Sequence, residues 1–152
     1  MLTNASARPQ MELAKQMSAS EVLARVEELK AAANRRLGGG QVDAACAEYE
    51  KATRLLRLVD GDDDAVGGLR LALRLNSAAC ELKAGRHDAA LGHSDAALAL
   101  APNSTKAMFR RGRSLEGLGR TDEAAAAYRA VLQHEPASRE ANTRLQALAA
   151  RS

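Results

Sequence analysis

The chain has 152 residues, a length typical of one domain. Apolar residues make up 46% and charged residues 27%, which excludes a disordered, collagen-like or mucin-like chain. Aromatic residues contribute only 2%, too few for the pleated faces of a β-sandwich or barrel, and the sequence is rich in the strong helix formers Ala, Leu, Arg and Glu. We therefore expect an all-α fold, and the net charge of +3 is too small to favour nucleic-acid binding.

The N-terminal residues 1–17 are expected to form a flexible segment. Residues 1–10 lack the apolar core of a signal peptide, and no run of about 18 apolar residues predicts membrane insertion. Cys46 and Cys80 lie 34 positions apart without a Cys-x-x-Cys pair, so both are expected to be reduced and buried. These features favour a cytoplasmic protein, with the nucleus as the alternative.

Capping and periodicity signals predict seven helices in chain order. Ser18-x-x-Glu21 has the pattern of a capping box and opens the first helix. The predicted helices span about residues 19–37, 42–58, 67–83, 87–100, 105–117, 121–134 and 138–150. Extra residues in the stretch RLVDGDDDAVGGLR are predicted to lengthen the second helix and the loop that follows it.

The sequence repeats itself with a period of 34 residues. Gly85 and Gly119 are 34 apart, and so are Pro102 and Pro136; an earlier copy carries Gly40, displaced by the extra residues. Each copy has a small residue in its first helix, a glycine closing that helix, and an alanine early in the second. These residues are Ala33, Gly40 and Ala45 in the first copy; Ala78, Gly85 and Ala90 in the second; and Gly112, Gly119 and Ala124 in the third.

A 34-residue period of helix, turn and helix resembles the tetratricopeptide repeat. The resemblance implies three repeats at about residues 21–58, 67–102 and 105–136, closed by a capping helix at about 138–150, within a domain spanning 18–152. It also implies a right-handed superhelical α-solenoid whose concave face is lined by the first helix of each repeat.

The sequence contains no complete catalytic or metal-binding pattern. His93-Ser94-Asp95 are consecutive on a predicted helix and point in different directions, so they cannot form a relay. The run Asp60–Asp64 begins like a calcium loop, but Ala65 and Leu71 occupy the positions that need Gly and Glu. Gly38–Gly40 lacks the Lys and Ser/Thr of a phosphate loop. We expect no enzyme, no cofactor and no metal site, and predict surface positions for the three histidines, His87, His93 and His134.

Basic and amide side chains lie on the predicted first helix of each copy. Lys30 and Asn34 form an i, i+4 pair in the first copy, Asn76 lies in the second, and Lys106 and Arg110 form an i, i+4 pair in the third. Residues three or four apart share one helix face, and the repeat register puts all five on the groove side. Any one of them would fit a solvated helix face, but the set in register indicates a binding surface.

This set resembles the two-carboxylate clamp of chaperone-binding tetratricopeptide domains, whose members include the large immunophilins and the Hsp-organising co-chaperone. In these relatives the clamp holds the C-terminal Glu-Glu-Val-Asp of heat-shock chaperones. The resemblance implies that Lys30, Asn34 and Asn76 bind the main-chain carboxylate, that Lys106 pairs with the Asp side chain, and that Arg110 reaches further up the peptide. Such charge-assisted hydrogen bonds are among the stronger ones.

Arg113 falls where Asn34 falls in the first copy, and two interpretations stay open. It adds positive potential to the groove, or it is a solvated arginine with a buried stem. Asp60–Asp64 is expected to be a solubilising loop.

The expected function is a non-catalytic, monomeric adaptor that binds the acidic C-terminal peptide of heat-shock chaperones. The alternatives are a tetratricopeptide scaffold for a non-chaperone partner and the regulatory module of an enzyme complex.

Overall fold

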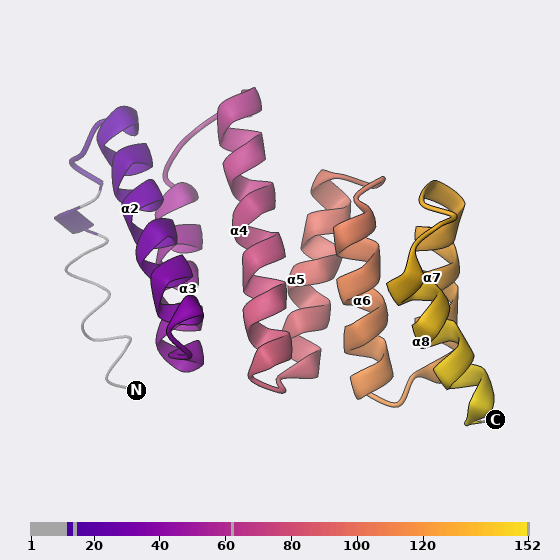
Figure 1. Cartoon of the computed structure of the whole chain (residues 1–152). Helices are drawn as coiled ribbons and strands as arrows, with labels where there is room; N and C mark the ends of the chain where they lie inside the picture. The colour runs from indigo at the N-terminus through magenta and orange to yellow at the C-terminus, as the bar shows by residue number, and fades with distance from the viewer. Residues whose placement is uncertain (1–11, 14, 62, 152) are drawn as a thin grey trace. The chain divides into compact units, whose positions relative to one another are not determined.

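The computed structural model describes residues 12–13, 15–61 and 63–151, and its secondary structure is helical (Figure 1). The predicted flexible segment 1–17 lies mostly outside the described residues and stays a prediction. From residue 19 onward, the described residues form seven helices: α2 (Ala19–Gly38), α3 (Val42–Leu56), α4 (Asp64–Lys83), α5 (His87–Leu100), α6 (Thr105–Gly117), α7 (Thr121–His134) and α8 (Arg139–Ala150). They confirm the all-α class, with three helix-turn-helix pairs followed by one further helix. In the described part of the chain, no helix is long and apolar enough to cross a membrane.

Serine caps and glycine turns set the helix boundaries. The hydroxyls of Ser18, Ser104 and Ser138 accept hydrogen bonds from backbone N–H groups at the starts of α2, α6 and α8. The three glycines predicted to close the first helix of each repeat have φ angles of 80°, 76° and 75°, the left-handed conformation that favours glycine; they are Gly40, Gly85 and Gly119. The repeat register therefore reflects a turn geometry that recurs three times.

The inserted residues extend the start of α4, contrary to the prediction that they lengthen the second helix. The second helix, α3, ends at Leu56 with 15 residues, close to the 14 residues of α5 and α7. The next helix, α4, has 20 residues and begins at Asp64. The side chain of Asp63 accepts a hydrogen bond from the N–H of Val66 at 2.8 Å, as an N-capping aspartate does. The acidic loop thus starts a helix as well as carrying charge.

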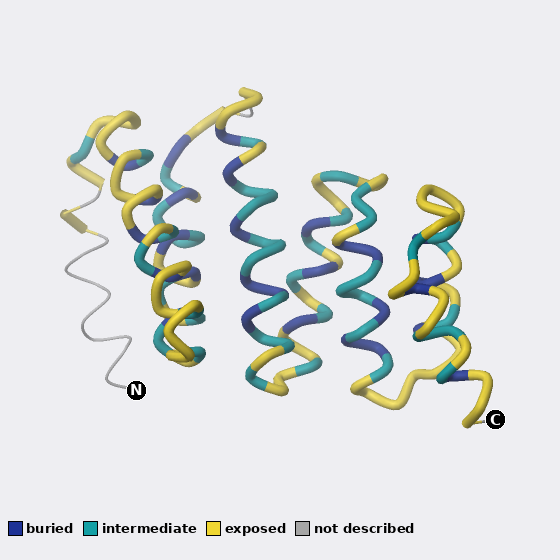
Figure 2. Tube along the Cα trace, in the orientation of Figure 1, coloured by how far each residue is buried: buried dark blue, intermediate teal, exposed yellow. Residues whose placement is uncertain are grey.

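The chain divides into two compact units, residues 1–73 and 74–152, and the division falls within α4. In the first unit α2 packs against α3 through two apolar stripes with helical spacing. The buried residues of these stripes are Val22, Val26, Leu29 and Ala33 on α2, and Ala45, Tyr49, Ala52 and Leu56 on α3. Figure 2 shows such buried positions alternating with exposed ones along the helices.

The second unit has its core between α6, α7 and α8. Met108 and Leu115 from α6, Tyr128 and Val131 from α7, and Leu148 from α8 are buried there. The helices α6 and α7 come so close that a Cβ added to Gly112 would lie 2.6 Å from the Tyr128 ring. A small residue is therefore required where the paired helices of this repeat cross.

The carboxylate of Glu116 ties the last three helices together. It accepts a hydrogen bond from the Tyr128 hydroxyl at 2.9 Å and lies 3.4 Å from a guanidinium nitrogen of Arg144. The Arg151 guanidinium is 3.7 Å away. Because the Glu116 side chain is only 11% exposed, these partners compensate the cost of burying its charge. The helix α8 is thus joined to its neighbours by a polar contact as well as by Leu148.

Cys46 and Cys80 are not joined in a disulfide, and only one of them is buried. Cys80 is inaccessible, whereas Cys46 is half-buried on α3. The prediction of two buried cysteines was therefore wrong for Cys46, because the α3 stripe that faces α2 runs through Ala45 and Tyr49 instead.

Candidate functional site

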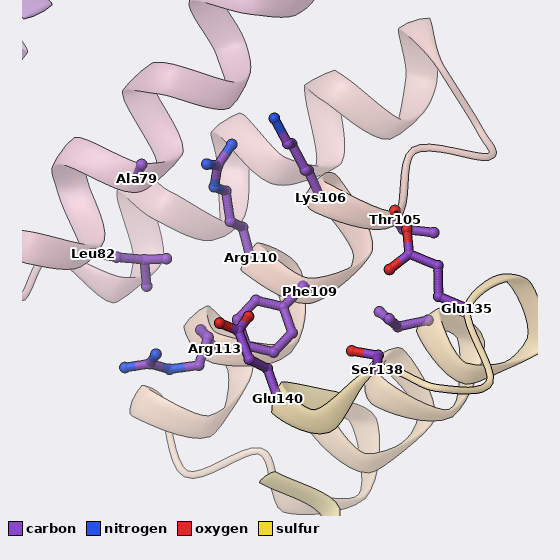
Figure 3. Close-up of a pocket in the computed structure, with 11 residues that line it drawn as sticks. Ala79, Leu82, Thr105, Lys106, Phe109, Arg110, Arg113, Glu135, Ser138 and Glu140 are labelled. Carbon is purple, nitrogen blue, oxygen red and sulfur yellow. Dashed lines mark hydrogen bonds between the residues drawn. The ribbon is translucent and has the colours of Figure 1, made fainter. Parts of the chain in front are cut away.

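One face of α6 carries three cations in a row. Lys106, Arg110 and Arg113 have i, i+4 and i+7 spacing, so they share one side of the helix. All three line a pocket of about 490 Å³ in the second unit, and Figure 3 shows them spread along α6. The structure therefore brings together three of the sequence-predicted residues, including the proposed accessory Arg113.

Besides the three cations, the pocket has apolar lining residues, here called its floor, and further polar lining residues, here called its rim. Phe109 lies on the floor, where its ring is 5.5 Å from the ring of Tyr128, centroid to centroid. The remaining apolar lining residues are Ala79, Leu82 and Val131, and the rim consists of Thr105, Glu135, Ser138 and Glu140. A ligand with acidic groups and at least one apolar side chain would match this lining.

Arg110 is held in place by the backbone of α4. Its Nη1 donates a hydrogen bond to the carbonyl oxygen of Leu75 at 3.0 Å. Burial lowers the pKa of Arg110 from its usual value, but a guanidinium keeps its charge in proteins. A fixed and partly desolvated cation interacts more strongly with an anion than a solvated one does.

Lys106 and Arg113 have no such tether. Lys106 is exposed and Arg113 is half-buried. Neither forms a hydrogen bond or an ion pair with another residue that the structure describes. Both side chains can turn toward an anionic ligand without giving up an existing bond.

Asn76 is half-buried on α4 and immediately follows Leu75, the acceptor for Arg110. This hydrogen bond joins the α6 cations to the part of α4 that carries Asn76. The side chain of Asn76 does not itself line the pocket.

Lys30 and Asn34 lie in the first unit, one turn apart on α2. The Lys30 Nζ is 3.2 Å from Glu27 Oε2, and the two side chains are 25% and 58% exposed. Such a partly exposed i, i+3 pair contributes little energy, and Lys30 can exchange Glu27 for another anion.

The amide of Asn34 is oriented by Tyr49. The Tyr49 hydroxyl, on the paired helix α3, donates a short hydrogen bond to Asn34 Oδ1. Because the oxygen is occupied, the NH₂ group of this exposed side chain is the part presented to a ligand. A donor group is what a carboxylate needs.

The predicted surface positions of the histidines hold only for His134, which is exposed. His93 is half-buried, and its Nδ1 lies 3.1 Å from the Arg74 guanidinium. His87 is also half-buried, because its ring packs against Gly117 of α6, where an added Cβ would lie 2.2 Å from Nδ1. The two residues face neighbouring helices, which their sequence positions do not reveal.

The remaining pocket residues, among them Phe109, Glu135 and Glu140, were not identified from the sequence. Phe109 directly precedes Arg110, and the two acids lie beyond the last repeated helix. The single signal for the two acids is their place on either side of the N-cap Ser138. Within the described ranges, no group of three or more His, Cys, Asp or Glu residues could hold a metal ion.

Comparisons with known proteins define the class. The sequence profile of the tetratricopeptide repeat family matches residues 81–141 and 109–151. The Arabidopsis OM64 tetratricopeptide domain superposes with a TM-score of 0.74 at 26% identity, covering 86% of this chain and 99% of that one. The chain contains tetratricopeptide repeats and shares the fold of tetratricopeptide domains.

Its neighbours include chaperone-binding domains of this family. The first tetratricopeptide domain of Spaghetti (RPAP3), solved with the HSP90 peptide SRMEEVD, has a TM-score of 0.69 and 27% identity over 83% of this chain and 91% of that one. The mitochondrial import receptor subunit TOM34 of Rattus norvegicus is 38% identical over 111 residues, or 71% of this chain. The match spans only about a third (34%) of that relative's length.

Proposed function

We propose that this domain is a non-catalytic adaptor that binds the acidic C-terminus of a cytosolic heat-shock chaperone through a two-carboxylate clamp. The observation that carries the proposal is the row of cations on α6, two of them without partners in the described structure, above a partly apolar pocket. The peptide in the Spaghetti complex, SRMEEVD, carries the matching chemistry: a chain-terminal Asp, two further acids and apolar residues.

The proposed roles are those that the resemblance to the clamp implies, and the chemistry of each side chain suits them. Lys30 and the amide groups of Asn34 and Asn76 donate to the main-chain carboxylate, and Lys106 pairs with the side chain of the terminal Asp. Arg110, already fixed on Leu75, reaches the peptide backbone or the next acid. A chain-terminal Asp is distinguished from an internal acidic segment because it presents two carboxylates on one residue.

Arg113 extends the cationic row by nearly one turn. It lines the same pocket as Lys106 and Arg110, which favours the interpretation in which it adds positive potential over that of a merely solvated side chain. We assign it to the acids that precede the terminal Asp.

Calorimetry with SRMEEVD as the free acid, as the C-terminal amide and with its terminal Asp changed to Asn tests the clamp. A charge-assisted hydrogen bond contributes about 1.5–3 kcal/mol, so each change is expected to weaken binding at least about tenfold. Equal binding of the amide and the free acid would contradict the proposal. It would favour the alternative scaffold for a non-chaperone partner.

A competition experiment separates the same alternatives in a cell extract. Chaperone retained by the immobilised domain should be displaced by an excess of the free-acid peptide and not by the amide. A partner that stays bound in the presence of the peptide uses another surface.

A further inference from the structure

The proposed site contains an acid that the clamp does not use. Glu140, in the first turn of α8, lines the same pocket as the three α6 cations. Its side chain forms no hydrogen bond or ion pair with any residue that the structure describes. An unpaired carboxylate in a site for an acidic peptide repels that peptide and weakens its binding, unless the peptide also carries a positive charge.

The other acid of the pocket is already engaged. Glu135 Oε1 accepts a hydrogen bond from the Thr105 hydroxyl at 2.6 Å, so Glu135 lies at the N-terminal end of α6. In Figure 3 it lies beside Thr105, whereas Glu140 enters the pocket on the side of Arg113. The unpaired acid of the pocket, Glu140, therefore lies near Arg113, at the end of the cationic row furthest from Lys106.

The length of this row fixes which ligand residue meets Glu140. From Lys106 to Arg113 the helix rises about 10 Å, the length of about three residues of extended peptide. With the terminal Asp at Lys106, as in the proposed function, the two preceding acids lie along the row. Side chains four to six positions before the terminus then reach the part of the pocket beyond Arg113.

We propose that Glu140 makes the site selective for acidic C-termini that carry a basic side chain about five residues before the terminal carboxylate. This inference rests on the proposed function and adds the class of peptide that the site prefers. The floor suits a long basic side chain, since the stem of an arginine can lie on Phe109 while its guanidinium pairs with Glu140. SRMEEVD has an arginine at this position.

The test is a double-mutant cycle by calorimetry at low ionic strength. The peptides are SRMEEVD and SAMEEVD, and the proteins are the intact chain and its Glu140→Gln variant. In the intact chain the alanine peptide should bind about two- to fivefold more weakly, the range typical of an exposed ion pair. In Glu140→Gln the two peptides should bind equally.

A matched control is available inside the same pocket. Glu135→Gln removes an equal charge from a carboxylate that is already paired with Thr105, and the preference for the arginine peptide should persist in it. A charge reversal sharpens the result: Glu140→Lys should prefer SEMEEVD over SRMEEVD. Because the readout is a ratio between two peptides, a general loss of α8 stability does not mimic it.

The outcomes separate this inference from the function on which it rests. If both peptides bind the intact chain equally, or if the preference survives in Glu140→Gln, the role of Glu140 is wrong and the clamp stands. If neither peptide binds the intact chain, the proposed clamp function is wrong, and so is the selectivity that rests on it.

Discussion

Arg110 is hydrogen-bonded to a neighbouring helix and Lys106 is not. Substitutions at the two positions should therefore differ in their effect on folding stability. Lys106 is exposed and bonds to no other described residue, whereas Arg110 donates to the Leu75 carbonyl of α4. Removing the first side chain therefore takes away only a ligand contact. Removing the second also leaves a gap between two helices.

Substitution of these residues gives the first prediction. Lys106→Ala should weaken SRMEEVD binding at least about tenfold and leave the melting temperature unchanged. Arg110→Ala should weaken binding by a similar factor and also destabilise the fold by about 1 kcal/mol, because it loses a hydrogen bond. Calorimetry and thermal unfolding followed by circular dichroism measure the two effects. A Lys106→Ala variant that unfolds as early as Arg110→Ala would contradict this assignment.

Tyr128 predicts the response of stability to high pH. Burial and, secondarily, the hydrogen bond to Glu116 raise the pKa of its hydroxyl above the ordinary value of 10. A raised folded-state pKa means that the stabilisation is fully present below pH 10 and is lost as the pH rises above it. Unfolding by urea at increasing pH should show this decline. The slope should be smaller in Tyr128→Phe, and an unchanged slope would exclude Tyr128 as its cause.

The grouping of Lys106, Arg110 and Arg113 could be predicted, because their i, i+4 and i+7 spacing places them on one face of α6. Lys30 and Asn34 share the same i, i+4 spacing on α2. The roles of Glu140 and of the Glu116 contacts could not be predicted, since both depend on α8, which has no counterpart among the repeats. The acceptor for Arg110 is a backbone carbonyl, and no side chain marks it in the sequence.

At the scale of the helices, close approach rather than composition decides which glycines matter. A Cβ at Gly112 would lie 2.6–2.9 Å from ring atoms of Tyr128, a buried side chain with little room to move. Gly92 also lies within a helix, α5, but nothing lies within 4 Å of its added Cβ. The two positions form a matched pair with opposite expectations.

Alanine at each glycine gives the third prediction. Gly112→Ala should destabilise the domain by about 1–3 kcal/mol, because it overpacks the contact between α6 and α7. Gly92→Ala should stabilise it by about 0.5–1 kcal/mol, since alanine loses less backbone entropy in a helix. Chemical denaturation measures both, and destabilisation by Gly92→Ala would show that α5 has a constraint at that position.

Helix ends were predictable where capping residues repeat and were missed where they do not. The turns at Gly40, Gly85 and Gly119 ended three helices at or within one residue of the predicted positions. The start of α4 was placed three residues late, because Asp63 was interpreted only as a charge in an acidic run. A capping role depends on one N–H that the sequence does not locate.

The cap at Asp63 leads to the fourth prediction. Asp63→Ala should cost about 0.5–2 kcal/mol of stability, whereas Asp63→Asn should cost much less, because both Asp and Asn cap helices well. Peptide affinity should be nearly unchanged in both variants, and any loss of affinity should be smaller than the loss in Lys106→Ala. Equal destabilisation by Asn and Ala would indicate that the charge, not the cap, stabilises α4.

For the whole molecule, the net charge is too small to attract an anionic ligand by itself, so the local placement of charges determines where such a ligand is attracted. The chain has 22 basic and 19 acidic residues, and much of this charge lies in exposed pairs such as Arg25–Glu28 and Arg54–Glu50. These pairs contribute little to stability. In the proposed function, the cations without partners on α6 therefore contribute disproportionately to the attraction of an acidic peptide.

Salt dependence gives the fifth prediction. A tenfold rise in salt concentration should weaken SRMEEVD binding several-fold, since charges near the surface are screened. The melting temperature should change little over the same range, because the core is apolar. Binding that is insensitive to salt would point to an apolar mode of recognition on Phe109 and Leu82 instead.

The floor of the pocket also makes this domain easy to observe. The chain has no tryptophan and one phenylalanine, and that phenylalanine is Phe109. In a Phe109→Trp variant the entire indole emission would arise from this pocket, with no background from elsewhere in the protein. Peptide titrations could then be read from intrinsic fluorescence, without labelling either partner, so the equilibrium and the kinetics of association become accessible in one unmodified solution.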